Sequence, residues 1–228
     1  MKPAIDPLPT TPTAAMLRTL AVVAALCGTI ITAAHQGTQA AIEGNKRLAI
    51  ERAVFKVIPA AVSVAEYLAL PEGRLVKVGA DKTAPAGAIK FYAGFDASGR
   101  LVGVAAEGAA KGYADTVRIL FAWEASSQAV TGFGVVSSRE TPGIGDKILV
   151  DKDFLANFPL EAKLSADMKT LANAIRTVKH GTKAYPWEID AIAGATITSR
   201  AVGRAIDETA QALLPRIAPH LAQLEDRP

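Results

Sequence analysis

A run of apolar residues near the N-terminus places the strongest constraint on how this chain folds. Residues 14–34, AAMLRTLAVVAALCGTIITAA, contain a single charged side chain, Arg18, close to one end. About 20 mostly apolar residues cross a bilayer as a helix, and an arginine near the end reaches the headgroups. The run therefore predicts a transmembrane anchor over residues 14–41. A cleaved signal peptide and a buried core helix are the two alternatives.

Composition limits what the rest of the chain does. The 228 residues leave room for one globular domain beside the anchor. The formal net charge is only +3 and no basic run is interleaved with aromatic residues, so nucleic acid is not expected as a partner. The single cysteine, Cys27, and three widely separated histidines give no metal-ligand spacing, and no metal site is expected. Residues 1–13 are rich in Pro and Thr and predict a disordered tail.

The segment after the anchor has a helical pattern. Ile50, Val54, Val57 and Ile58 fall on one face of residues 42–58 and predict an amphipathic helix, which Pro59 ends. Glycines and prolines then indicate a linker or short elements as far as residue 86. We therefore expect residues 42–86 to be a juxtamembrane helix and linker, and residues 87–228 to be the folded domain.

Four β-strands are predicted as two hairpins. Residues 89–95 and 101–106 form the first pair, and residues 116–123 and 129–137 form the second, each joined by a short polar turn. The segments around the two turns resemble each other weakly, which suggests that one hairpin unit is used twice. The strands mix β-branched and aromatic residues, as half-buried sheets do.

Two helices are expected to cover this sheet. Within residues 154–178, apolar side chains recur every three or four positions: Leu164, Met168, Leu171, Ile175 and Val178. Residues 201–224 have a second such pattern, which Pro215 and Pro219 are expected to kink or split. The predicted fold class is α+β: a twisted antiparallel sheet with packed helices, preceded by one N-terminal transmembrane helix.

The first stretch suited to ligand contact is ETPGIGDKI, residues 140–148, which directly follows a predicted strand. Pro142, Gly143 and Gly145 form a tight loop in which the backbone approaches a flat ligand closely. An ordinary turn between a strand and a helix is the alternative.

The second stretch is DAIAGATITSRAV, residues 190–202. Small and hydroxylated residues occupy its centre: Gly194, Ala195, Thr196, Thr198 and Ser199. We expect Thr198 or Ser199 to cap a helix that starts near Ala201, and the free N–H groups at such a helix start bind phosphate. Thr196 is then held beside an anion site, or all three hydroxyl residues are simply helix caps.

The second stretch resembles the flavinylation motif of FMN-binding domains. The resemblance lies in the run from Ala193 to Thr196, with Asp190 ahead of it and Thr198 behind it. Such domains occur in the G subunit of Rnf electron transport complexes and in the C subunit of the sodium-pumping NADH:quinone oxidoreductase. The resemblance implies that FMN phosphate is esterified to Thr196 and that a flavin transferase reads Asp190. The family usually has Ser or Thr at the position of Ala193.

The first stretch also resembles this family. The loop is similar to the Rnf-type ETPGLG loop, which lies against the isoalloxazine ring, and the matching residues are Glu140, Thr141, Pro142, Gly143, Ile144 and Gly145. Gly112 and Tyr113 are similar too, as is the segment from Asn45 to Pro59. The resemblance runs from the anchor to about Leu214, and it has both motifs in the family's order.

The resemblance implies an electron-transfer subunit that is not catalytic alone. Rnf complexes move electrons between ferredoxin and NAD and couple this to Na⁺ or H⁺ transport. The partners would be the other membrane subunits of the complex and the flavin transferase. The chain would lie in the bacterial inner (cytoplasmic) membrane as a single-pass protein, with the C-terminal domain on the periplasmic or outer face. The charges beside the span, such as Lys46, Arg47 and Arg52, predict the opposite orientation, and we follow the resemblance.

Three alternatives belong to other functional classes. One is the corresponding FMN subunit of the Na⁺-pumping quinone reductase. Another is an FMN-binding sensor or regulatory membrane protein outside any pump. The third is a structural membrane subunit without redox function, in which Thr196 is only a helix cap.

Overall fold

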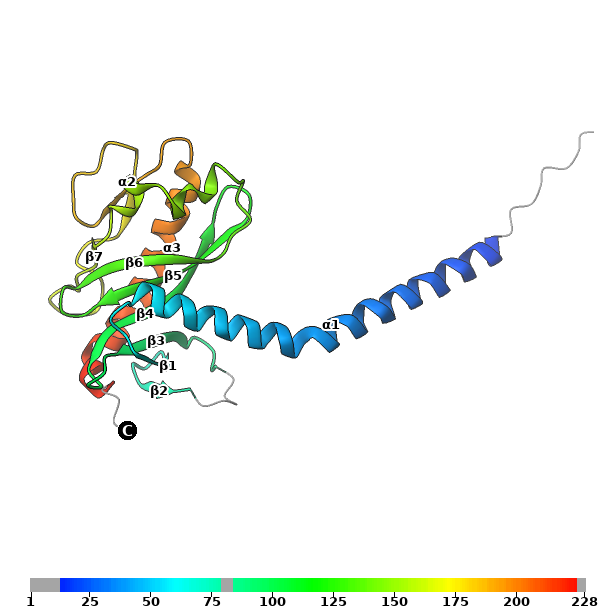
Figure 1. Ribbon diagram of the computed structural model, residues 1–228, viewed down its shortest axis with the longest axis horizontal. Helices are drawn as coiled ribbons and strands as arrows, with labels where there is room; N and C mark the ends of the chain where they lie inside the picture. Colours follow the sequence, from blue (N-terminus) through cyan, green and yellow to red (C-terminus); the bar gives the residue numbers. More distant parts are fainter. Residues whose placement is uncertain (1–12, 79–83, 225–228) are drawn as a thin grey trace, which may run out of the picture. The chain divides into compact units, whose positions relative to one another are not determined.

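A seven-stranded antiparallel sheet, ordered β2-β1-β3-β4-β5-β6-β7, forms the centre of the computed structural model (Figure 1). The structure describes residues 13–78 and 84–224. The strands are β1 (Ser63–Ala69), β2 (Leu75–Lys77), β3 (Ile89–Phe95), β4 (Leu101–Lys111), β5 (Thr116–Glu124), β6 (Ala129–Ser137) and β7 (Leu160–Glu161). Both edge strands, β2 and β7, have at most three residues. Short edges leave little unpaired backbone for another chain to extend.

Both predicted hairpins are present. Strands β3 and β4 pair around a turn in which the Asp96 carboxylate accepts the N–H groups of Ser98 and Arg100, and Gly99 has a φ of 75°. Strands β5 and β6 form the second pair. The sheet is larger than the two predicted hairpins. Strands β1 and β2 come from the stretch expected to be a linker or short elements, and β7 comes from the segment predicted to be helical.

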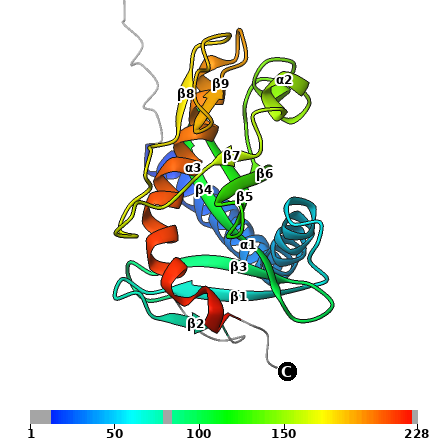
Figure 2. The same cartoon turned by 90° about the vertical axis from the view of Figure 1, so that its left-hand side faces the viewer.

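One face of the sheet is covered by α3 (Thr196–Ile217), which lies against β4 and β5 (Figure 2). Its Val202, Ile206 and Leu213 join the core formed by alternate strand residues such as Phe121 and Trp123. The helix approaches β4 so closely that a Cβ on Gly108 would lie 2.4 Å from the carbonyl oxygen of Ala205. Glycine is therefore needed where the helix crosses this strand.

The other face is covered by the last turns of α1 (Thr13–Val57). Ile50, Val54 and Val57 pack with Tyr92 and Leu120 in a second, smaller core, as the amphipathic pattern predicts. The apolar run and the amphipathic segment are one continuous helix, since no proline interrupts them. It ends at Val57, ahead of Pro59.

The N-terminal part of α1 is a candidate membrane span. Thr13–Gln39 is long and apolar enough to cross a bilayer, with a mean hydropathy of 2.0, although a signal sequence has the same properties. The chain divides into two units, Met1–Leu48 and Ala49–Pro228. The tail predicted for residues 1–13 lies, apart from Thr13, outside the described residues. The predicted α+β class, with one N-terminal apolar helix, is confirmed.

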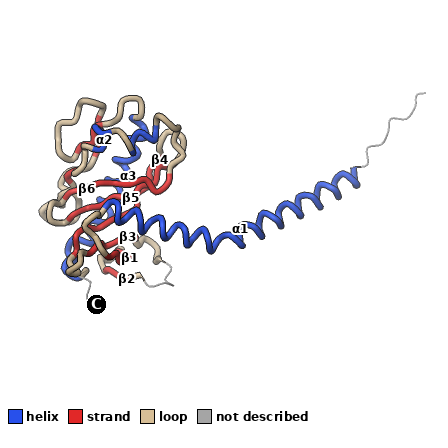
Figure 3. Tube along the Cα trace, viewed as in Figure 1, coloured by secondary structure: helices blue, strands red, loops and turns tan. Residues whose placement is uncertain are grey.

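The helix predicted within residues 154–178 was wrong. Only α2 (Lys152–Leu155) is helical there, and most of the chain from α2 to α3 is loop (Figure 3). Leu164 and Leu171 face each other across an antiparallel bridge, with Met168 between them at a φ of 56°. These residues are therefore spaced as in a helix but form a bend in the chain.

Side chains take over the backbone hydrogen bonds that a helix would use in this segment. Asp207 on α3 accepts the N–H of Ile175 at 2.7 Å, and Gln211 accepts that of Leu171 at 3.1 Å. The bend itself is closed by Ser165, whose hydroxyl donates to Asp167. Ser and Asp form such local bonds readily, and these bonds compete with helix formation.

The last predicted helix begins earlier than expected. It starts at Thr196 instead of near Ala201, and it continues through Pro215 to Ile217. A 3-10 helix, η2 (Ala218–Gln223), follows, with Pro219 near its start. A small parallel pair, β8 (Arg176–Val178) and β9 (Glu188–Asp190), lies next to α3 and leads into it.

Candidate functional site

A tight turn connects β9 to α3 and places Thr196 at the first position of the helix. The N–H of Ala195 donates to the carbonyl of Ile192 at 3.1 Å, and Gly194 has a φ of +81°. A glycine at this φ is typical of the third residue of a type II turn. Ala195 is the N-cap residue, and no side chain caps the helix. The expectation that Thr198 or Ser199 caps it was wrong, because α3 already includes both residues.

The three hydroxyl residues in the first turn of α3 have different surroundings. Thr198 and Ser199 are buried. The Thr198 hydroxyl donates to Glu140, whereas Ser199 Oγ donates to the Ala195 carbonyl at 2.9 Å and accepts the Ile192 N–H at 3.1 Å. Thr196 is half-buried, and its hydroxyl has no hydrogen-bond partner within residues 13–78 and 84–224. Of the three, Thr196 therefore has the hydroxyl that is available for reaction.

The start of α3 also offers an electrostatic environment for an anion. The first N–H groups of any helix lack partners within the helix, and among the described residues no side chain caps this helix start. They form the positive end of a helix of 22 residues. A phosphate attached to Thr196 would be stabilised by these groups.

Glu140 lies inside the fold, although the sequence placed it in a ligand-contact loop. Its side chain is 9% exposed. Its carboxylate accepts the backbone N–H groups of Tyr113 at 3.2 Å, Ala114 at 3.0 Å and Asp115 at 3.3 Å, as well as the Thr198 hydroxyl. The β4–β5 turn, the loop after β6 and the start of α3 therefore meet at one carboxylate.

Two glycines make space for this carboxylate. A Cβ on Gly112 would lie 2.6 Å from Oε1 of Glu140, and a Cβ on Gly145 would lie 2.4 Å from its Cβ. Burial raises the pKa of Glu140, but the hydrogen bonds from Thr198 and the three backbone N–H groups outweigh burial, so that its pKa lies below the ordinary value. Glu140 is therefore ionised at neutral pH.

The rest of the predicted contact loop faces solvent. Thr141, Pro142, Gly143 and Ile144 are exposed. The Thr141 carbonyl accepts the N–H groups of Ile144 and Gly145, and Gly143 has a φ of +77°. The chain then enters the 3-10 helix η1 (Gly145–Leu149). The loop thus presents open backbone and the Ile144 side chain, which is 51% exposed.

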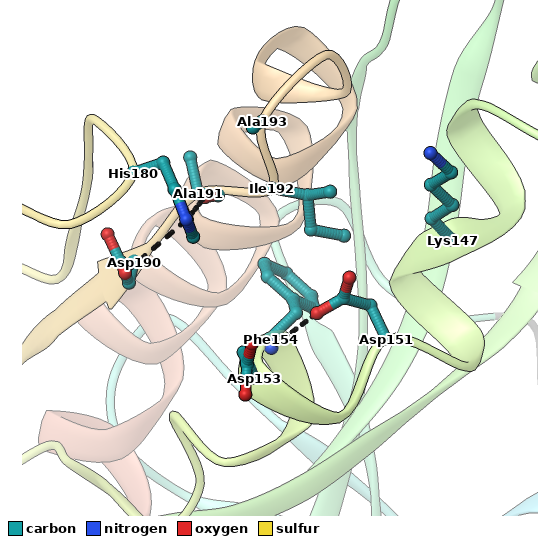
Figure 4. Close-up of a pocket in the computed structure, with 9 residues that line it drawn as sticks. All are labelled: Lys147, Asp151, Asp153, Phe154, His180, Asp190, Ala191, Ile192 and Ala193. Carbon is teal, nitrogen blue, oxygen red and sulfur yellow. Dashed lines mark hydrogen bonds and ion pairs between the residues drawn. The ribbon is translucent and has the colours of Figure 1, made fainter.

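Asp190 ends β9 and lines a pocket of about 210 Å³ (Figure 4). Both oxygens of its carboxylate accept the Gly181 N–H, at 2.8 and 3.0 Å. His180 Nδ1 lies 3.7 Å from the same carboxylate. Asp190 is half-buried, and its carboxylate holds the neighbouring turn at Gly181. Ala193 lines the same pocket, and Lys147 lies on the side of the pocket opposite Asp190 (Figure 4).

The sequence did not indicate Asn157 as part of this arrangement. This buried side chain binds both backbone groups of Asp190: it accepts the N–H at 2.8 Å and donates to the carbonyl at 3.2 Å. It also accepts a bond from Lys183. No motif marks Asn157, because its role depends on contacts distant in sequence. Within the described residues, no group of three His, Cys, Asp or Glu is arranged to bind a metal ion.

Comparisons with known proteins identify a matching domain family and related subunits. The model of the FMN-binding domain family matches residues 112–211, which include the Glu140 loop and the first turn of α3. The G subunit of the Na(+)-translocating ferredoxin:NAD(+) oxidoreductase complex of Acetobacterium woodii is 30% identical over 159 residues, which are 68% of this chain and 70% of that protein. The chain belongs to the family of G subunits of ion-translocating oxidoreductase complexes.

A second G subunit matches over a shorter stretch. The G subunit of the ion-translocating oxidoreductase complex of Methanosarcina acetivorans is 30% identical over 114 residues, which cover 50% of this chain but only 53% of that protein. Among solved structures, NqrC of Shewanella oneidensis has a TM-score of 0.61 at 23% identity, over 79% of this chain and 98% of that chain. At that identity the structural likeness supports the fold alone.

Proposed function

We propose that this chain is the membrane-anchored flavoprotein subunit of an Rnf-type ferredoxin:NAD oxidoreductase, with FMN attached through a phosphodiester to Thr196. One observation carries the assignment of the residue. The Thr196 hydroxyl is half-exposed and without a partner among the described residues, whereas those of Thr198 and Ser199 are buried and engaged. An acceptor of a large cofactor needs an accessible hydroxyl.

The residues around Thr196 fit such a cofactor. The uncapped N–H groups of α3 suit the phosphate, and Ile197, next to Thr196, is 49% exposed and apolar. The Thr141–Ile144 loop offers an apolar side chain and accessible backbone for a flat ring. FMN, when bound, supplies one- and two-electron transfer chemistry. Thr196 would keep it on the protein, the start of α3 would stabilise the phosphate, and the Thr141–Ile144 loop would be available to the ring.

The relatives support the wider assignment. The Acetobacterium woodii protein is named as part of a Na(+)-translocating ferredoxin:NAD(+) oxidoreductase complex. We infer that this chain likewise works with other membrane subunits, which bind ferredoxin and NAD, and that a flavin transferase loads it. Thr13–Gln39 would anchor it as a single-pass protein of the bacterial cytoplasmic membrane, with the domain on the periplasmic side.

Intact-mass analysis of protein made together with its flavin transferase tests the proposal. We expect an increase equal to FMN less one water, and peptide mapping should place it on Thr196. Thr196→Ala should abolish the adduct, whereas protein made without the transferase should lack it from the start. An adduct on Thr198 or Ser199 would show that the acceptor is misassigned. Complete absence of the adduct on the parent chain would refute covalent attachment.

A further inference from the structure

We propose that Glu140 is a positioning residue that, through Thr198, fixes the first turn of α3 against the loop after β6. The inference rests on the proposed function of Thr196, whose position this turn sets. Glu140 itself need not touch the flavin. Its carboxylate faces inward and is fully engaged by protein groups.

The bonding pattern makes Glu140 a bridge between separate segments. Oε1 accepts the N–H groups of Ala114 and Asp115, and Oε2 accepts the Tyr113 N–H and the Thr198 hydroxyl. A carboxylate is a rigid plane, and the three successive N–H groups of the β4–β5 turn fix its orientation. The Thr198 hydroxyl is therefore held at a position that this turn defines.

The packing around Glu140 restrains its side chain. Its backbone N–H donates to Ser138 Oγ at 3.2 Å. Gly112 lies against the carboxylate and Gly145 against the Cβ, each closer than a Cβ of its own would permit. The loop that carries Thr141–Ile144 leaves directly from this fixed residue, so the loop and the start of α3 share one reference point.

The bond to Thr198 matters more for the first turn of α3 than for the rest of the helix. Further along, Val202, Ile206 and Leu213 are held by the apolar core and do not depend on Glu140. The first turn has no capping side chain, and helix ends fray most easily. Ser199 ties this turn to the preceding one, whereas Thr198 ties it to the loop.

The test compares three variants of the full-length chain in detergent. Thr198→Val keeps the shape of the side chain and removes the hydroxyl bond to Glu140. Glu140→Gln retains a bridge, because the Thr198 hydroxyl can accept from the new amide, but it loses the Tyr113 bond. Ile206→Val is the matched control, because it loosens the fully buried core of the same helix away from the first turn.

Two readouts separate positioning from stability. The first is hydrogen exchange of residues 112–115 and 196–200 in flavin-free protein carrying Thr196→Ala. The second is the initial rate of flavin attachment by the transferase in chains that keep Thr196. We expect Thr198→Val to speed exchange in both segments and to slow attachment by roughly twofold to tenfold, the range of one net hydrogen bond. For Glu140→Gln, both the exchange rate and the rate of flavin attachment should lie between those of Thr198→Val and the parent.

The Ile206→Val control shows what a loss of stability without a loss of positioning looks like. Ile206→Val should lower the melting temperature while leaving both readouts at the parent level. If Thr198→Val behaves like this control in exchange and attachment, Glu140 is not a positioning residue, even though the parent is flavinylated. If the parent is not flavinylated at all, the proposed function fails, and the exchange measurement still decides whether Glu140 holds the turn.

Discussion

At the scale of single residues, Thr196 and Thr198 differ in what their hydroxyl groups can do. Thr198 donates to an ionised carboxylate inside the fold, and Thr196 stays half-exposed beside it on the same turn. The sequence identified both positions by resemblance, but residue type alone left their roles open. Burial separates them, and the buried Thr198 hydroxyl is bound to Glu140, a residue that is remote in sequence.

The ionised state of Glu140 leads to a prediction about pH. Because its pKa is lowered in the folded chain, its contribution to stability is fully present above the ordinary value of 4.5 and is lost as pH falls through the lower folded pKa. Glu140→Gln lacks this term and should be less stable at neutral pH. Melting temperatures from pH 7 downwards should show the gap between parent and variant closing in acid. A constant gap would mean that Glu140 is not ionised in the fold.

Asp190 supports a second prediction at this scale. We expect Asp190→Ala to block flavin attachment, as the motif implies. Asp190→Ala should also lower the stability modestly, by about 0.5–1.5 kcal/mol. The reason is that the exposed Gly181 N–H loses its hydrogen bond to the Asp190 carboxylate and binds water instead. Chemical unfolding and in-gel flavin fluorescence measure the two effects. His180→Ala is the control, since it leaves the carboxylate in place. Full flavin loading of Asp190→Ala would contradict recognition of this residue.

At the scale of elements, the predictions succeeded where a pattern was local. The two hairpins and the amphipathic end of α1 follow from alternation, turn residues and helical spacing, each read within a few residues. The helix predicted within residues 154–178 was wrong, because Asp207 and Gln211 on α3 accept hydrogen bonds from backbone N–H groups of this segment. The predicted start of α3, near Ala201, was also wrong, because it assumed a side-chain cap. The sequence offers several hydroxyl residues for a cap, and the structure uses none of them.

The crossing of α3 over β4 gives a prediction for this scale. Gly108→Ala places a methyl group 2.4 Å from the Ala205 carbonyl oxygen, so the helix must move away from the strand. Overpacking of this kind typically costs about 1–3 kcal/mol. Gly132→Ala is the matched control, because it lies in the same sheet with nothing within 4 Å of the new Cβ. Denaturant unfolding should show a clear loss for the first and little change for the second. Equal losses of stability in the two variants would mean that the effect comes from strand propensity and not from the contact with α3.

At the scale of the whole molecule, the domain begins inside α1 and not after it. Ile50, Val54 and Val57 cover one face of the sheet, and burying each contributes about 1.5–3 kcal/mol. A fragment starting at Ala49 should therefore fold, whereas one starting at Ala61 should expose Tyr92 and Leu120 and aggregate. Size-exclusion chromatography and circular dichroism distinguish the two. Two equally soluble, folded fragments would show that the helix end is dispensable.

The side of the membrane on which the domain lies is the last prediction. More basic residues follow the candidate span than precede it, among them Lys46, Arg47 and Arg52, so charge alone favours a cytoplasmic domain. Long domains, however, translocate largely regardless of such charges. The unit from Ala49 to Pro228 is a long domain, and the family resemblance implies flavin attachment outside the cytoplasm.

We therefore expect a C-terminal alkaline phosphatase fusion to be active and a fluorescent cytoplasmic reporter at the same site to be dark. The same two fusions on a chain lacking residues 1–39 provide the control, since removal of the apolar run should reverse both signals. An inactive phosphatase with a bright cytoplasmic reporter on the full chain would place the domain inside the cell. In that case Lys46, Arg47 and Arg52 set the orientation, and a transferase acting on Thr196 must work in the cytoplasm.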